Sequence, residues 1–140
     1  MGAAKSFMRT ETQEWVAKAE ADFRSAQLEM SAPNFDAACF HAQQCAEKYL
    51  KASLQEHRQA FPKTHDLELL LELLLPVAPQ LAALRGAAQE LAGHSVEFRY
   101  PGIWADEATA RSALHHGRLI RAEIRRVLQL PEDGTQGVTK

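Results

Sequence analysis

The stretch that decides the fold is FDAACFHAQQCAEKYLKASLQEH, residues 35–57. Apolar and small residues recur in it every three or four positions, which is the spacing of one face of an α-helix. The small side chains on this face would let a second helix approach closely. We therefore expect residues 35–57 to form a helix that buries Phe35, Ala38, Cys39, Ala42, Ala46, Tyr49, Leu50 and Ser53.

Helical spacing continues on both sides of this stretch. A first helix is predicted over residues 12–30 and a last one over residues 107–128, behind Asp106 as its N-cap. Between them, Thr64 is predicted to cap a third helix that prolines 76 and 79 end, and a fourth begins near residue 80. The faces expected to be buried carry Trp15, Val16, Ala19, Phe23, Ala26 and Met30; Leu81, Leu84, Ala88 and Leu91; and Ala110, Ala113, Leu114, Gly117, Ile120, Ile124 and Val127.

The composition favours the same fold class. The chain has 24 Ala and 17 Leu but only 5 Val and 3 Ile, and alanine and leucine are strong helix formers whereas β-branched residues favour strands. We therefore predict an all-α, up-down antiparallel bundle of four long helices and one short one. It would occupy residues 12–130 as one domain, between a flexible leader (1–11) and a disordered tail (131–140). Residues 93–104 are expected to be a loop or a frayed helix.

The charge balance is nearly neutral, with 16 basic and 18 acidic residues. It is uneven, however: residues 1–98 carry 9 basic and 13 acidic groups (−4), whereas residues 99–126 carry 6 and 3 (+3). A globally basic nucleic-acid-binding protein is thereby excluded, but an anionic partner of the last helix is not. The apolar run 67–78 is too short and too interrupted to span a membrane, and the two cysteines indicate reduced thiols in a cytoplasmic protein.

Two groups of polar residues could carry function. The first, here called the polar strip, runs along residues 41–51; it is either a solvated face with local ion pairs or an interface for a partner or a phosphate. The second, here called the basic ridge, is predicted on the last helix opposite its buried face, where it could contact phosphates or acidic helices. The polar strip consists of His41, Gln44, Cys45, Lys48 and Lys51 with Glu47 beside it, and the basic ridge of Arg111, His115, Arg118 and Arg125 with Arg121 just outside.

Metal and nucleophile motifs are scarce. His41 and Cys45 have the spacing of two metal ligands, but no second pair has compatible spacing, so no metal or cofactor is predicted. Arg111 and His116 have the spacing of a metal-independent ribonuclease pair, in which arginine stabilises the phosphorane charge and histidine transfers a proton. On one helix the two would lie about 140° apart, so they do not converge.

Three segments, in this order, resemble the HEPN domain family. They are Phe40–Ala52 (FHAQQCAEKYLKA), Pro62–Leu67 (PKTHDL) and Arg99–Gly102 (RYPG) before the last helix, and the resemblance covers roughly residues 12–128. It implies a helical bundle that is commonly dimeric, pairs with a small nucleotidyltransferase and has a role in nucleotide or RNA binding. Some relatives are toxin ribonucleases with an Arg-x4-6-His motif near the start of the last helix. Arg99 is closest to that place here, yet residues 104–106 are Trp, Ala and Asp, with no histidine.

Three functions follow as hypotheses. The leading one is a non-catalytic HEPN protein that dimerises, acts with a nucleotidyltransferase and contributes to nucleotide binding. The second is a ribonuclease toxin of a toxin-antitoxin pair with Arg99 or Arg111 and His115 or His116 in its site, and the third is a structural helix-bundle adaptor. The candidate nucleotide or partner contacts are His41, Gln44, Glu47, Lys48, Lys51, His65, Arg99, Tyr100 and Arg118.

Overall fold

All regular elements of the structure are helices. The computed structural model describes residues 8–94, 98 and 100–131, and no strand occurs among them. The predicted all-helical fold is confirmed, although the structure has three long and two short α-helices where four long and one short were expected. The elements are α1 (Thr10–Ser31), α2 (Phe35–Glu56), α3 (Leu67–Leu74), the 3-10 helix η2 (Pro79–Leu84), α4 (Arg85–Ala92) and α5 (Glu107–Val127).

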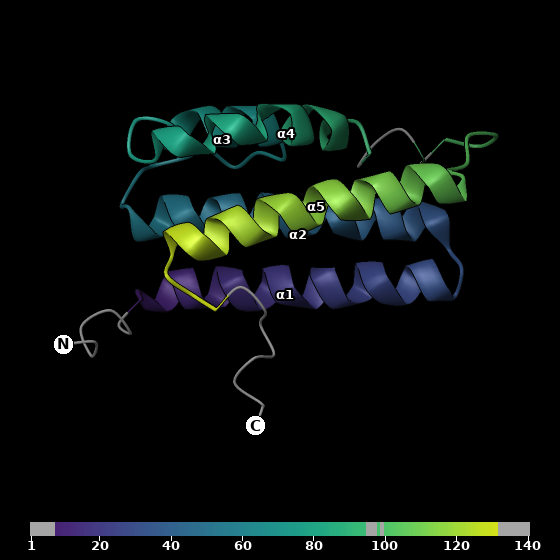
Figure 1. Cartoon of the computed structure of the whole chain (residues 1–140), viewed down its shortest axis with the longest axis horizontal. Coiled ribbons are helices and arrows are strands. Elements are labelled where there is room, and N and C mark those ends of the chain that lie inside the picture. Colours follow the sequence, from purple (N-terminus) through teal and green to yellow (C-terminus); the bar gives the residue numbers. More distant parts are fainter. Residues whose placement is uncertain (1–7, 95–97, 99, 132–140) are drawn as a thin grey trace, which may run out of the picture.

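The helices form three layers, as Figure 1 shows. Helix α1 forms one outer layer, α2 and α5 lie beside each other in the middle, and α3 and α4 cover the opposite side. A short connection at residues 32–34 makes α1 and α2 antiparallel. Helix α5 instead runs parallel to α2. Asp36 contacts Ala105 near the start of both helices, and Tyr49 contacts Arg125 toward their ends.

Side-chain caps define the starts of α3 and α5. Asp106 caps α5 as predicted, because its carboxylate accepts from the backbone N–H of Thr109 at 2.8 Å. The predicted cap of α3 is wrong by two residues: Asp66, not Thr64, accepts from the N–H of Leu69 at 3.1 Å. Thr64 Oγ1 accepts from the N–H of Asp66 instead, so that it supports the capping residue. Helix α1 begins at Thr10, two residues earlier than expected.

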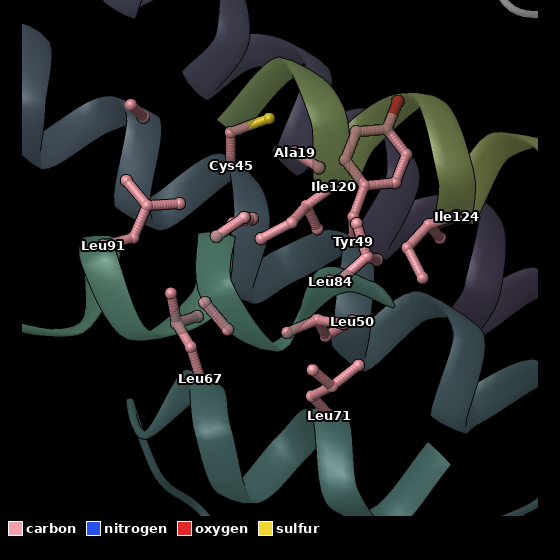
Figure 2. Close-up of a cluster of buried hydrophobic side chains, with 14 of the residues drawn as sticks. Ala19, Cys45, Tyr49, Leu50, Leu67, Leu71, Leu84, Leu91, Ile120 and Ile124 are labelled. Carbon is pink, nitrogen blue, oxygen red and sulfur yellow. The ribbon is translucent and has the colours of Figure 1, made fainter. Parts of the chain in front are cut away.

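The core lies between the layers and is rich in leucine and alanine. Figure 2 shows Ile120 and Ile124 of α5 on the side of leucines from α3, η2 and α4, whereas the ring of Tyr49 points the other way, toward α5, where its hydroxyl bonds to Arg125. Of the 25 residues predicted to be buried, 19 are buried. The exceptions are half-buried because they lie at the edges or ends of their helices: Trp15, Val16, Met30, Phe35, Leu114 and Val127.

Some predictions concern segments that the structure does not describe. Most of the leader and tail, as well as Val96 and Arg99, lie outside the described residues. Among the described residues, Cys39 and Cys45 are buried thiols that form no disulfide. None of the helices in the described part of the chain is both long and apolar enough to cross a bilayer.

Candidate functional site

The polar strip of α2 is held by two carboxylates, of which the first is Asp22 of α1. Asp22 Oδ1 lies 2.8 Å from His41 Nδ1, and its Oδ2 accepts from Lys48 Nζ at 2.6 Å. The side chains of His41 and Lys48 remain about a quarter exposed, at 27% and 23%. Asp22 falls on the face of α1 that packs on α2, one residue before the core residue Phe23, and its role was not predicted.

The second carboxylate is Glu47, which is 2% exposed and lies within α2 itself. Lys51 Nζ donates to it at 2.9 Å, and His65 Nδ1 lies 3.0 Å from its Oε1. Gln43 and Gln44 also direct their side-chain amides toward it, at 3.5 and 3.4 Å. The segment after α2 must run back along that helix to bring His65 there (Figure 1), which the spacing of residues 47 and 65 along the chain does not reveal.

This internal pairing changes the interpretation of the polar strip. Glu47 and Lys51 were candidate contacts for a ligand, but both are buried and bonded to each other, as burial of charged groups requires. Cys45, expected on the strip, is fully buried because α1 covers that side of α2. Its thiol pKa is raised, chiefly by burial. Asp22 pairs with Lys48 and Glu47 pairs with Lys51, so that carboxylates already balance the charges of both lysines of the strip.

The basic ridge of α5 is divided by packing against α1. Arg125 was expected on the exposed ridge and Arg121 just outside it, yet their side chains are only 6% and 9% exposed. Arg121 donates to both oxygens of Glu20, at 2.7 and 3.1 Å, and stacks over the ring of Phe23. Arg125 Nη1 donates to the hydroxyl of Tyr49 at 2.8 Å. The prediction that Arg125 lies on an exposed ridge is therefore wrong. Helix α1 places Glu20 over this flank of α5, and this carboxylate is the counter-charge for both buried arginines.

Glu20 is the centre of this network. The hydroxyl of Tyr49 also donates to it, so that α1, α2 and α5 meet at one carboxylate. Burial by itself would raise the pKa of Glu20, but the hydrogen bonds from Arg121 and Tyr49 and the two arginine charges hold it below its ordinary value. Burial and the adjacent Glu20 raise the pKa of Tyr49. These groups stabilise the fold and are not free to bind a ligand.

The exposed part of the basic ridge is Arg111, His115 and Arg118. An open hollow of 570 Å³ is lined by Arg111 and His115 together with Glu107, Ala108 and Ser112. Glu107, one turn earlier, pairs with Arg111. His116 lies away from the hollow, as its angle around the helix predicts, and its Nδ1 is buried without a hydrogen-bond partner. The structure thus places Arg111 and His115 at the hollow, whereas His116, whose ring lies 5.4 Å from that of His115, does not line it.

The loop before α5 exposes large apolar side chains. Tyr100, Ile103 and Trp104 are 60%, 43% and 78% exposed. The loop is nevertheless anchored, because Asp36 accepts from the N–H of Ala105 at 2.7 Å and the N–H of Ile103 donates to the carbonyl of Tyr100 at 3.2 Å. Sequence reasoning selected Tyr100 but missed Trp104, since exposure of an aromatic residue in a loop has no periodic signal. Arg99 lies outside the described residues.

Metal chemistry finds no support in the placed side chains. Across residues 8–94, 98 and 100–131, no group of three or more His, Cys, Asp or Glu side chains is arranged to hold a metal ion. His41 and Cys45 have the sequence spacing of two metal ligands. In the structure, His41 instead binds Asp22, and Cys45 is buried in the core.

Comparison with known proteins agrees with this fold. No curated protein sequence matches the chain. The crystal structure of TT1696 from Thermus thermophilus is similar, with 26% identity and a TM-score of 0.69 over 82% of this chain and 96% of that one. The crystal structure of ST0689, an archaeal HEPN homologue, has the same fold, with 24% identity and a TM-score of 0.67 over 84% and 97% of the two chains.

The three segments that resemble a HEPN domain lie in or next to helices of the bundle. Phe40–Ala52 is in the central helix α2, Pro62–Leu67 leads into α3, and the Tyr100 turn precedes α5. The family model for the HEPN domain matches residues 12–127, which span the bundle from α1 to the last residue of α5. This protein belongs to the HEPN domain family.

Proposed function

We propose that this HEPN domain protein is non-catalytic, forms a dimer and acts together with a small nucleotidyltransferase, contributing contacts to its nucleotide. The observation that carries the proposal is the anchored loop that exposes Tyr100, Ile103 and Trp104. Large apolar side chains grouped on a loop are typical of a surface that another protein covers, and tryptophan and tyrosine are common interface anchors.

The groups available to a nucleotide lie on α5 and at the edge of α2. Arg118 is exposed and has no hydrogen-bonded acceptor in the part of the chain that the structure describes. His41 and Lys48 are partly exposed, although Asp22 already binds both. We therefore place the nucleotide contact at Arg118 and Tyr100 rather than at the polar strip, because Lys51 and Glu47 neutralise each other.

The test begins with a search for a small nucleotidyltransferase gene beside that of this protein, whose absence would contradict the partnership, and then uses the full chain alone and co-expressed with that product. Size-exclusion chromatography with light scattering should give twice the chain mass for this protein alone and a larger complex after co-expression. Calorimetry with ATP should detect binding that is weakened in the Arg118→Gln variant. A monomer that neither binds ATP nor retains a nucleotidyltransferase would contradict the proposal.

A metal-independent ribonuclease is the second candidate, and one observation favours it. Arg111 and His115 line the same open hollow, so that a phosphodiester there would meet both a guanidinium and an imidazole. The guanidinium would stabilise the phosphorane charge and the imidazole would transfer a proton. This candidate predicts RNA cleavage in the presence of EDTA that is lost in Arg111→Ala and His115→Ala but retained in His57→Ala, which changes a histidine at the end of α2.

A further inference from the structure

Residues from the start of α1 and the end of α2 line a second hollow. Figure 1 shows that α1 begins and α2 ends at the same end of the bundle, opposite the loop before α5. The hollow measures 440 Å³, which is within the size range of small-molecule sites. Its polar lining consists of two arginines and two glutamines, and each of these side chains carries hydrogen-bond donors. The lining residues are Arg9, Gln55, Arg58, Gln59, Ala60 and Phe61.

The two arginines of this hollow differ from most others in the molecule. Of the nine arginines that the structure describes, five donate a side-chain hydrogen bond to a carboxylate, a hydroxyl or a carbonyl. The other four have no such acceptor among the described residues, and two of those four, Arg9 and Arg58, line this one hollow. The side-chain amides of Gln55 and Gln59 likewise lack partners within the described part of the chain.

The neighbouring carboxylates accept no hydrogen bond from the guanidinium group of Arg9. Glu56 Oε1 accepts from the backbone N–H of Arg9 at 3.1 Å, not from its guanidinium. Glu11 is 61% exposed and approaches Arg9 Nη2 only to 4.0 Å, beyond hydrogen-bond distance. The Nε of Arg9 is buried without an acceptor, which is unfavourable for a charged group. A ligand oxygen at that edge would supply the missing acceptor after a small rotation of the side chain.

The opposite wall is held rigidly by the end of α2. Arg58 has a left-handed backbone with φ of 55°, and its N–H donates to the carbonyl of Gln55 at 3.1 Å. The N–H of Gln59 donates to the carbonyl of Leu54 at 2.9 Å, which completes a Schellman motif. Phe61 packs edge-on against Trp15, with ring centroids 6.4 Å apart. The Schellman motif thus fixes the backbone from which the side chains of Arg58 and Gln59 extend.

We propose that this hollow binds a phosphate group, held between the guanidinium groups of Arg9 and Arg58 with Gln55 and Gln59 as additional donors. Guanidinium groups match the oxygens of a phosphate with paired hydrogen bonds. Two such groups and two amides offer more donors than one carboxylate can accept, whereas a phosphate has more oxygens to bind them. Phe61 and Ala60 leave an apolar wall for the organic part of a phosphorylated ligand.

The experiment is calorimetry on the full chain with three probes. These are inorganic phosphate, AMP, and a short single-stranded RNA without terminal phosphates. Binding of phosphate or AMP alone would identify a free phosphate or a monoester as the ligand, and binding of the RNA alone would identify a phosphodiester. Either result supports the site if the variants below behave as expected, and absence of binding by all three probes overturns it.

Three variants decide whether the binding occurs in this hollow. Arg9→Gln and Arg58→Gly should each weaken binding at least tenfold. Arg24→Gln, which changes an exposed α1 arginine that also lacks an acceptor among the described residues, should change it less than twofold. Because glycine favours the left-handed backbone at residue 58, Arg58→Gly should keep or raise the thermal midpoint, so unfolding cannot explain its loss of binding. Wild-type binding by Arg9→Gln and Arg58→Gly, or equal weakening by Arg24→Gln, overturns the proposal.

Discussion

Glu20 of α1 binds side chains of both α2 and α5. It accepts hydrogen bonds from Arg121 and Tyr49, and Arg125 lies 3.7 Å away. Glu20→Gln would leave two buried guanidinium groups without a counter-charge, and breaking a buried pair in this way costs about 3 kcal/mol or more. We expect urea denaturation to show a loss of that size. Glu72→Gln, which breaks the exposed pair with Arg85, should have a much smaller effect; equal losses in both variants would contradict the role of Glu20.

The same residue predicts how stability depends on pH. The pKa of Glu20 is lowered in the folded protein from an ordinary value of 4.5, so its ionised form stabilises the fold above that pH. As the pH falls from 4.5 through the lower folded-state pKa, protonation removes this contribution. Urea unfolding of the wild type and Glu20→Gln at pH 7, 5, 4 and 3 should therefore show a stability difference that shrinks toward pH 3. A difference that stays constant would mean that the Glu20 charge does not stabilise the fold.

At the scale of whole helices, Gly117 sets how closely α5 approaches α2. A Cβ at this position would lie 3.1 Å from the carbonyl oxygen of Ala42, which is backbone and cannot easily move. Gly117→Val should therefore lower the free energy of unfolding by about 2 kcal/mol through overpacking. Gly86→Ala in α4, where nothing lies within 4 Å, should instead raise it by up to about 1 kcal/mol. Denaturation of both variants tests this contrast, and a neutral Gly117→Val would show that the helices are not in close contact.

The end of α5 offers a second test of an element. Gln129 has φ of 60°, a left-handed conformation that glycine adopts without the steric cost of a side chain. The N–H of Leu130 donates to the carbonyl of Arg125 at 2.8 Å, so this conformation ends the helix in a Schellman motif. Gln129→Gly should stabilise the protein by about 1 kcal/mol. Gln89→Gly within α4 should destabilise it by about the same amount, and thermal unfolding that orders the two variants otherwise would refute this assignment.

For the whole molecule, the exposed loop before α5 predicts where association occurs. Trp104 is 78% exposed, so Trp104→Ala removes little that the isolated chain needs for stability. In the proposed complex it should nevertheless remove a large buried contact, and co-purification with the nucleotidyltransferase should be lost while the thermal midpoint of the chain stays unchanged. Val77→Ala, which truncates an exposed apolar side chain after α3, should leave the complex intact. An intact complex with Trp104→Ala, or loss of the complex with Val77→Ala alone, would locate the interface elsewhere.

Prediction from the sequence succeeded for several local features, although the cap of α3, also local, was predicted two residues too early. Asp106 caps α5 and Pro76 lies just beyond the end of α3, because capping and proline geometry involve residues within one helical turn. The core face of α2 followed from spacing alone, since residues three and four apart share one side of a helix. The segments that resemble a HEPN domain also led to the correct family.

The candidate site was predicted less well, and the reason is geometric. Helical periodicity gives the angle of Arg121 and Arg125 around α5, but not that α1 covers this flank with Glu20, a residue 101 positions from Arg121. It likewise does not reveal that His65 reaches Glu47 or that Arg9 and Arg58 meet at one hollow. By itself, the sequence determined the helices, their faces and the family, because these depend on nearby residues. Only the tertiary structure decided which charged groups bind each other and which remain open to a ligand, because burial of a polar side chain depends on the helix that packs over it.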